Sequence, residues 1–218
     1  MTMAEMAEKA AVHLTGELAL DAGKTDFLRY GLEIIFCTLI KAVSLFSLAY
    51  LLGIIPEVAF ALFFWSIYRM ASGGAHCSGY WRCLSLGLII FVAAGKLGLY
   101  LEPYISMEVM GFLLPAGFLL AAVCVLIWAP GEGPYSTVTG TARRRFYQLV
   151  SLVCLGLWLA ASWQIMVHYS ASIVIAGFIA VLIQTFSFTP PGFQAIERLD
   201  SLMEGLFKRK GGKNQCCG

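Results

Sequence analysis

Six long apolar stretches constrain the fold of this chain more than any other feature of its sequence. A helix needs about 20 mostly apolar residues to cross a bilayer, and all but the second stretch come close to that length. Hydrophobic residues make up 59% of the chain and charged residues 13%, so a soluble globule could not cover its apolar side chains with polar ones. The runs are unbroken, whereas a β-barrel shows short segments of alternating polarity. The sequence therefore predicts an all-α polytopic membrane protein with six transmembrane helices. They are Gly31–Gly53, Val58–Met70, Leu84–Leu101, Val109–Trp128, Leu149–Val167 and Ser172–Phe188.

The second stretch is short for a span, so it either extends across Pro56, tilts, or is partly re-entrant. We find no repeat and no second domain, which predicts one integral-membrane domain over residues 1–218. Its parts are an N-terminal segment 1–26, a six-helix core 27–190 and a basic C-terminal tail 191–218.

The N-terminal segment is charged, which argues against a cleavable signal peptide. Five apolar residues in it recur at helical spacing, which predicts an amphipathic helix on the membrane or on the protein. They are Met6, Ala10, Leu14, Leu18 and Ala19.

Lysine and arginine alternate cleanly between the two sides of the predicted spans. The segments 54–57, 102–108 and 168–171 contain neither residue type, whereas the termini and the segments 69–83 and 129–148 contain all the basic residues outside the spans. Basic loops stay in the cytoplasm, so both termini and both basic loops are expected there. The net charge of +2 gives no support to nucleic-acid binding.

Three charged residues fall inside the predicted spans, namely Glu33, Lys41 and Lys96. Intramembrane charges commonly pair between helices or extend to the interface, and we favour that interpretation. The alternative is a transporter or channel, in which the three groups would mark a polar pathway across the bilayer.

One predicted cytoplasmic loop carries the residues for chemistry. It runs from Arg69 to Cys83, is rich in glycine, and contains both a thiol and an imidazole. A thiolate is a good nucleophile, and a neighbouring histidine activates it, so we predict that His76 and Cys83 are catalytic. On one continuous helix they would stand about 10 Å apart. The chain must therefore break or bend between them, and Gly79 is a residue that permits it.

The other residues of this loop leave several roles open. Arg69 and Arg82 bracket it and could hold a substrate carboxylate or favour thiolate, and Gly73 and Gly74 allow close approach of the backbone to a substrate. Cys77 points away from His76, so Cys83 is preferred as the nucleophile. A zinc site from His76, Cys77 and Cys83 is an alternative that lacks a fourth ligand. The group that orients His76 is open between Gln148, Gln184 and a backbone carbonyl.

The run Arg69, Gly73-Gly74-Ala75-His76 and Cys83 resembles the motif of the accessory gene regulator B family of bacterial quorum-sensing membrane peptidases. Ala129-Pro130, followed by a basic stretch, is similar to a second element of that family. The resemblance covers nearly the whole chain. Two departures are the segment after Pro130, which reads Gly-Glu-Gly-Pro-Tyr, and the terminal pair Cys216-Cys217.

The resemblance implies a cysteine endopeptidase without a metal or other cofactor. Its substrate would be a small precursor peptide with an amphipathic N-terminal helix and an acidic C-terminal tail. The enzyme would remove the tail, retain the rest as a thioester on Cys83, and assist its cyclisation to a thiolactone or lactone. The acidic tail would meet basic residues, and we expect substrate binding by Arg69, Gly74, Arg82, Arg143, Arg144 and Arg145.

The resemblance also implies a homodimer. Small residues on the predicted spans, including Gly111, Gly117, Gly156 and Gly177, would let helices of two subunits pack closely. The same residues equally fit packing within one chain.

Overall fold

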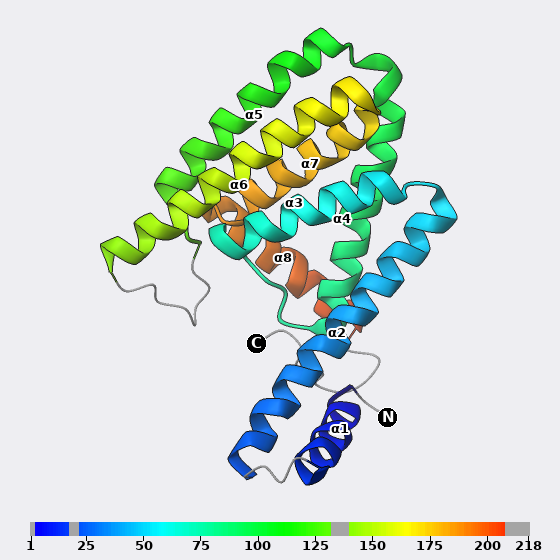
Figure 1. Ribbon diagram of the computed structural model, residues 1–218, viewed down its shortest axis with the longest axis vertical. Helices are drawn as coiled ribbons and strands as arrows, with labels where there is room; N and C mark the ends of the chain where they lie inside the picture. The colour runs from blue at the N-terminus through cyan, green and yellow to red at the C-terminus, as the bar shows by residue number, and fades with distance from the viewer. Residues whose placement is uncertain (1–2, 18–21, 132–139, 208–218) are drawn as a thin grey trace.

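The computed structural model describes residues 3–17, 22–131 and 140–207 of the chain, and every element in these ranges is helical. Figure 1 shows α3, α5, α6 and α7 side by side, while α1 lies beside α2 at the lower end of the molecule. The elements are α1 (Met3–Glu17), α2 (Ala22–Leu52), α3 (Ile55–Ser72), α4 (Tyr80–Leu101), the short 3-10 helix η1 (Glu102–Tyr104), α5 (Met107–Trp128), α6 (Thr141–His168), α7 (Ala171–Ser187) and α8 (Pro190–Phe207).

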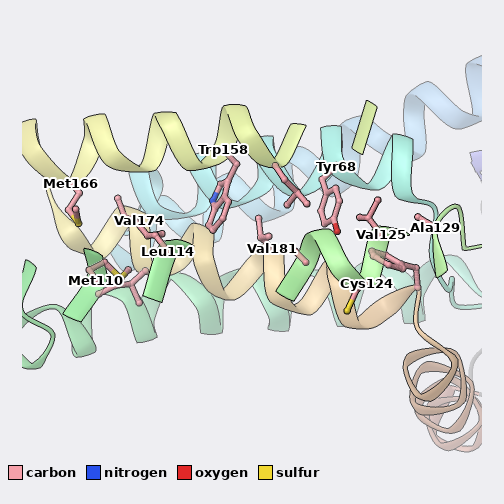
Figure 2. Packing of buried hydrophobic residues seen from close by; sticks show 14 residues of the cluster. Tyr68, Met110, Leu114, Cys124, Val125, Ala129, Trp158, Met166, Val174 and Val181 are labelled. Carbon is pink, nitrogen blue, oxygen red and sulfur yellow. The ribbon is translucent and has the colours of Figure 1, made fainter. Parts of the chain in front are cut away.

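Helix α7 lies at the centre and packs against α3, α4, α5 and α6. Its glycine and alanine residues allow this close packing, since a Cβ on Gly177 would lie 2.5 Å from the Phe60 ring. The main apolar cluster follows the bundle from Met110 and Met166 at one end to Ala129 at the other (Figure 2). The bundle core thus fixes α3 and α7 against each other. The loop that follows α3 therefore starts from a fixed position next to α7.

The predicted small residues divide between the two roles that the sequence left open. Gly117 and Gly177 meet aromatic rings of this same chain, whereas Gly111 and Gly156 have open space where a Cβ would stand. The first pair therefore serves packing within the chain, and a role in dimerisation stays a prediction.

Each of the six predicted spans corresponds to one helix, α2 to α7. Four of them, α2, α4, α5 and α6, are long and apolar enough to cross a membrane, and the bent pair α7 and α8 would make five. Helix α3 begins at Ile55 and therefore does extend across Pro56, but it reaches only 18 residues. The chain is thus a membrane protein with four to five candidate spans, and the six-span arrangement remains a prediction.

Helix α1 packs on α2 along a line of small side chains that is offset by one residue from the predicted stripe. Ala7, Ala11 and Thr15 are buried, whereas Leu14 is 38% exposed. The small side chains, rather than the leucine, face α2 because they let the two helices approach closely. Leu18 and Ala19 lie outside the described residues, and binding of α1 to the membrane surface stays a prediction.

The chain turns by 94° between α7 and α8. The Thr189 hydroxyl donates to the Phe186 carbonyl at 2.7 Å and accepts from the Gly192 amide at 3.3 Å. A Cβ on Gly192 would lie 1.8 Å from the Phe186 oxygen, so only glycine fits. The predicted basic tail thus begins with a helix, and residues 208–218, including Cys216 and Cys217, lie outside the described residues.

Candidate active site

The loop between α3 and α4 is held through its backbone on two sides. The Gly74 amide donates to the Gly131 carbonyl at 3.3 Å, and the Gly131 amide donates to the Ser72 carbonyl at 2.8 Å. On the other side, the Ala75 amide donates to the carbonyl of Ser187, the last residue of α7, at 3.1 Å. These bonds join the loop to two segments that are distant in sequence.

Glycine is required at two positions of the loop, where it contacts Gly131 and the end of α7. Gly73 and Gly74 have φ angles of 69° and 137°, which residues with a Cβ rarely adopt. A Cβ would lie 2.4 Å from the Gly131 oxygen in the first case and 2.6 Å from the Ser187 hydroxyl in the second. The structure therefore explains both glycines by contacts within the chain, and substrate binding by Gly74 stays a prediction.

The helix breaks between His76 and Cys83, as the spacing requires. His76 lies in the loop and Cys83 lies in the first turn of α4, which begins at Tyr80. The positive φ angles lie before His76, at Gly73 and Gly74. Gly79 directly precedes α4 with a φ of −130°, an extended conformation open to any residue, so the break does not depend on the conformational freedom of glycine at this position.

A buried polar network centred on Gln184 fixes the start of the loop. The Gln184 side chain accepts from Arg69 Nη1 at 3.0 Å, and it donates to the Ser72 hydroxyl at 3.1 Å and to the Gly73 carbonyl at 2.8 Å. Arg69 Nη2 donates to the Ala75 carbonyl. Arg69 therefore uses both terminal nitrogens to shape the loop, and a contact with substrate stays a prediction.

His76 and Cys83 share two positively charged neighbours, Lys41 and Arg69. The Lys41 ammonium of α2 lies 3.5 Å from Cys83 Sγ. Arg69 interacts electrostatically with Cys83, and His76 interacts with Arg69 and Lys41. Loss of hydration and these two positive charges lower the pKa of His76 to about 4. The imidazole is therefore neutral at pH 7 and available to accept a proton.

Cys77 has a different environment from Cys83. Its side chain is buried, and its burial, with the neighbouring Cys83 and Asp200, raises the pKa of its thiol to about 11. A protonated thiol is a poor nucleophile, which supports the preference for Cys83. In the described part of the chain, His76, Cys77 and Cys83 do not gather as metal ligands, so nothing there favours the zinc alternative.

Arg82 connects the start of α4 to α8. Its Nε lies 3.2 Å from Asp200 Oδ1, its Nη1 donates to the Asp200 carbonyl at 3.0 Å, and its Nη2 donates to the Ser78 hydroxyl at 2.6 Å. The same hydroxyl donates to Asp200 Oδ2 at 2.7 Å. No feature of the sequence predicts this contact, because Ser78 and Asp200 are 122 residues apart in the chain. Substrate binding by Arg82 stays a prediction.

The three arginines at the start of α6 differ in their surroundings. Arg144 Nη2 donates to the Ile127 carbonyl at 2.8 Å and Nε to the Ala129 carbonyl at 3.3 Å, while Gln148 donates to Ala129 at 3.1 Å. Both side chains thus satisfy carbonyls at the end of α5. Arg143 and Arg145 are exposed. The loop 132–139 lies outside the described residues.

These contacts also bear on two earlier alternatives. The amide of Gln148 bonds to the end of α5 and that of Gln184 to the Arg69 network, so within the described residues neither amide hydrogen-bonds to His76. Lys96 donates to the Leu52 carbonyl at 2.9 Å, and it lies 13 residues or about 20 Å along α4 from Cys83. Lys41 and Lys96 therefore act in separate places, which gives no support to a continuous polar pathway.

The fold and the loop together define a polytopic membrane protein with a candidate cysteine site beside its basic loops. Comparison with known proteins then gives the particular family. The chain belongs to the family described as AgrB, accessory gene regulator B, whose sequence model matches residues 7–188. This membership confirms the resemblance drawn from the motif.

Curated relatives carry the same family name. A "Putative AgrB-like protein" of Clostridium acetobutylicum is 27% identical over 142 residues, which cover 65% of either chain. Two proteins of Clostridium perfringens, of the SM101 and 13 strains, are 36% and 34% identical over 38% and 40% of this chain and 39% and 41% of their own lengths. The matched regions thus span less than two thirds of each relative. No solved structure is significantly similar.

Proposed function

We propose that this protein is a membrane-embedded cysteine endopeptidase that removes the C-terminal tail of a small quorum-sensing precursor peptide. The observation that carries the proposal is the placement of Cys83 at the start of α4, where it shares the positively charged neighbours Lys41 and Arg69 with the neutral imidazole of His76. Membership of the AgrB family supports the proposed substrate class.

The proposed reaction begins when His76 accepts the thiol proton as Cys83 Sγ attacks the scissile carbonyl. The carbon–nitrogen bond then breaks, and the imidazolium returns the proton to the leaving amine of the tail. The remaining peptide is held as a thioester on Cys83. An internal thiol or hydroxyl of the peptide attacks this thioester, which closes the thiolactone or lactone ring and regenerates the Cys83 thiol.

The structure supports a division of labour among the basic residues. Arg69, Arg82 and Arg144 make hydrogen bonds within the chain. Arg143, Arg144 and Arg145 are all exposed at the start of α6, so an acidic tail would bind first there, above all at Arg143 and Arg145. We further propose that this face and both termini are cytoplasmic, following the distribution of lysine and arginine, and that the enzyme is a homodimer.

The test uses the full chain in proteoliposomes with a precursor peptide from the same genome, and mass spectrometry follows release of the tail. Cys83→Ala and His76→Ala are expected to abolish release. Cys77→Ala is the matched control, since this thiol lies in the same loop but is buried, and it should retain activity. Tail release by Cys83→Ala at the wild-type rate would refute the proposal.

A further inference from the structure

We infer that Lys41 is a catalytic residue whose ammonium group stabilises the anionic sulfur of Cys83. The inference deepens the proposed function, because it concerns the same thiol, but its direct consequence is a property of the thiol without substrate. The thiol proton moves to His76 during the reaction and to water in the free enzyme, so Lys41 takes no part in proton transfer.

The position of Lys41 carries the argument. Its Nζ stands 3.5 Å from Sγ, the distance of a hydrogen bond to sulfur, and 5.2 Å from the centre of the Tyr80 ring. Tyr80 is 1% exposed and its hydroxyl donates to the Cys37 carbonyl of α2 at 3.3 Å. The aromatic ring and α2 are therefore fixed to each other, and a cation over the ring face is held there. Tyr80 thus positions the ammonium group beside the sulfur.

The groups that interact with the Cys83 sulfur include Lys41 of α2, Arg69 of α3 and Cys77 of the loop. His76 shares the neighbours Lys41 and Arg69 with this sulfur, while Arg82 of α4 and Asp200 of α8 interact with Cys77. The Asp200 carboxylate is paired with Arg82 at 3.2 Å. The balance at the sulfur is therefore positive, which favours thiolate.

The usual partner of a catalytic thiolate is an imidazolium ion, and this site does not supply one at neutral pH. Loss of hydration, with Arg69 and Lys41, lowers the pKa of His76 to about 4. His76 can therefore accept the thiol proton but carries no charge in the resting enzyme. The two roles that one histidine often combines are here divided between His76 and Lys41.

The experiment measures alkylation of Cys83 by iodoacetamide as a function of pH, in the full chain in detergent micelles, with peptide mass spectrometry to resolve each cysteine. The variants are Lys41→Met, which removes the charge but keeps most of the length, and Lys41→Arg, which keeps the charge. Lys96→Met is the control, because this lysine is also on a spanning helix but bonds to the Leu52 carbonyl.

An opposite charge at this distance changes the thiolate fraction by about 10- to 100-fold. We expect Lys41→Met to slow alkylation of Cys83 at pH 7 by that factor and to regain the wild-type rate near pH 10. Lys41→Arg and Lys96→Met should stay within about threefold of the wild type. A wild-type rate for Lys41→Met at pH 7, or a loss that persists at pH 10, overturns the inference.

The pH profile of Cys83 alkylation in the wild type tests the inference even where Lys41→Met does not fold. Half-maximal alkylation of Cys83 well below pH 8.5, the approximate value of a free thiol, supports the inference, and a midpoint at or above that value overturns it. Failure of the proposed function is recognised separately, since it appears as tail release by Cys83→Ala and leaves the alkylation profile unchanged.

Discussion

Replacing Gln184 by leucine tests whether the loop is held from α7. Leucine has a similar volume, so the change removes polar contacts and creates little empty space. The wild-type side chain is fully buried and bonds to Arg69, Ser72 and Gly73 at 2.8–3.1 Å. In the variant, one guanidinium nitrogen and one backbone carbonyl lose their partners inside the protein.

Each buried polar group without a partner costs about 1–3 kcal/mol. Two such groups give an expected loss of about 3 kcal/mol in the free energy of unfolding, and thus a fall of roughly 6–12 °C in Tm for a chain of this size. Tail release should fall more than tenfold, because the loop that carries His76 is no longer fixed.

The assay is thermal unfolding in detergent, followed by circular dichroism, with tail release measured on the same preparations. Gln164→Leu is the matched control, since Gln164 is exposed on α6, and it should leave both quantities unchanged. Gln184→Glu keeps the acceptor for Arg69 and should lie between the two. A Tm for Gln184→Leu within 2 °C of the wild type, with normal tail release, would refute the role of this network.

Three further predictions concern other contacts of the site. Arg144→Ala should lower the free energy of unfolding by about 1 kcal/mol through loss of bonds to the end of α5, whereas Arg145→Ala should not; denaturant titration compares them. Because the pKa of His76 is lowered to about 4, this imidazole should add no acid limb of its own to the rate of tail release between pH 7.5 and 5.5, and any fall in that range should follow the alkylation profile of Cys83. The free energy of unfolding should decline as pH falls from about 6.5 toward 4, since the unfolded chain binds this proton more readily; an acid limb of the rate near 6.5 that is absent from the alkylation profile would contradict it. Asp200→Asn should remove the ion pair with Arg82 while leaving the bond from Arg82 to the carbonyl of residue 200, and limited proteolysis within α8, followed by peptide mapping, should become faster than in the wild type.

The sequence was sufficient for the helices because hydrophobicity is a local property. Each apolar stretch became one helix, and the glycine-rich loop fell between α3 and α4 as its composition indicated. The number of membrane crossings was harder to derive. Helix α3 carries Glu57 and Arg69 within 18 residues, and α7 stops at a sharp turn, so neither meets the length and polarity of an ordinary span by itself.

The contacts that shape the site could not be derived from the sequence, because they join residues far apart in the chain. Lys41 reaches Cys83 across 42 positions, and Arg82 reaches Asp200 across 118. The motif gave His76, Cys83 and Arg69 but not Gln184, since a glutamine in an apolar helix has many uses. Lys41 had been interpreted as an ordinary intramembrane charge, because its distance from the thiol depends on how α2 and α4 pack.

Because the loop is held by α7, the candidate site can form only after the ribosome has synthesised α7. Gln184 follows its partner Arg69 by 115 residues, and at about 5–20 residues per second the ribosome needs roughly 6–23 s to cover that separation. During this interval the nascent chain already contains the thiol and the imidazole but lacks the helix that aligns them. Peptide processing is therefore expected only from finished chains, after the last apolar segment has entered the bilayer.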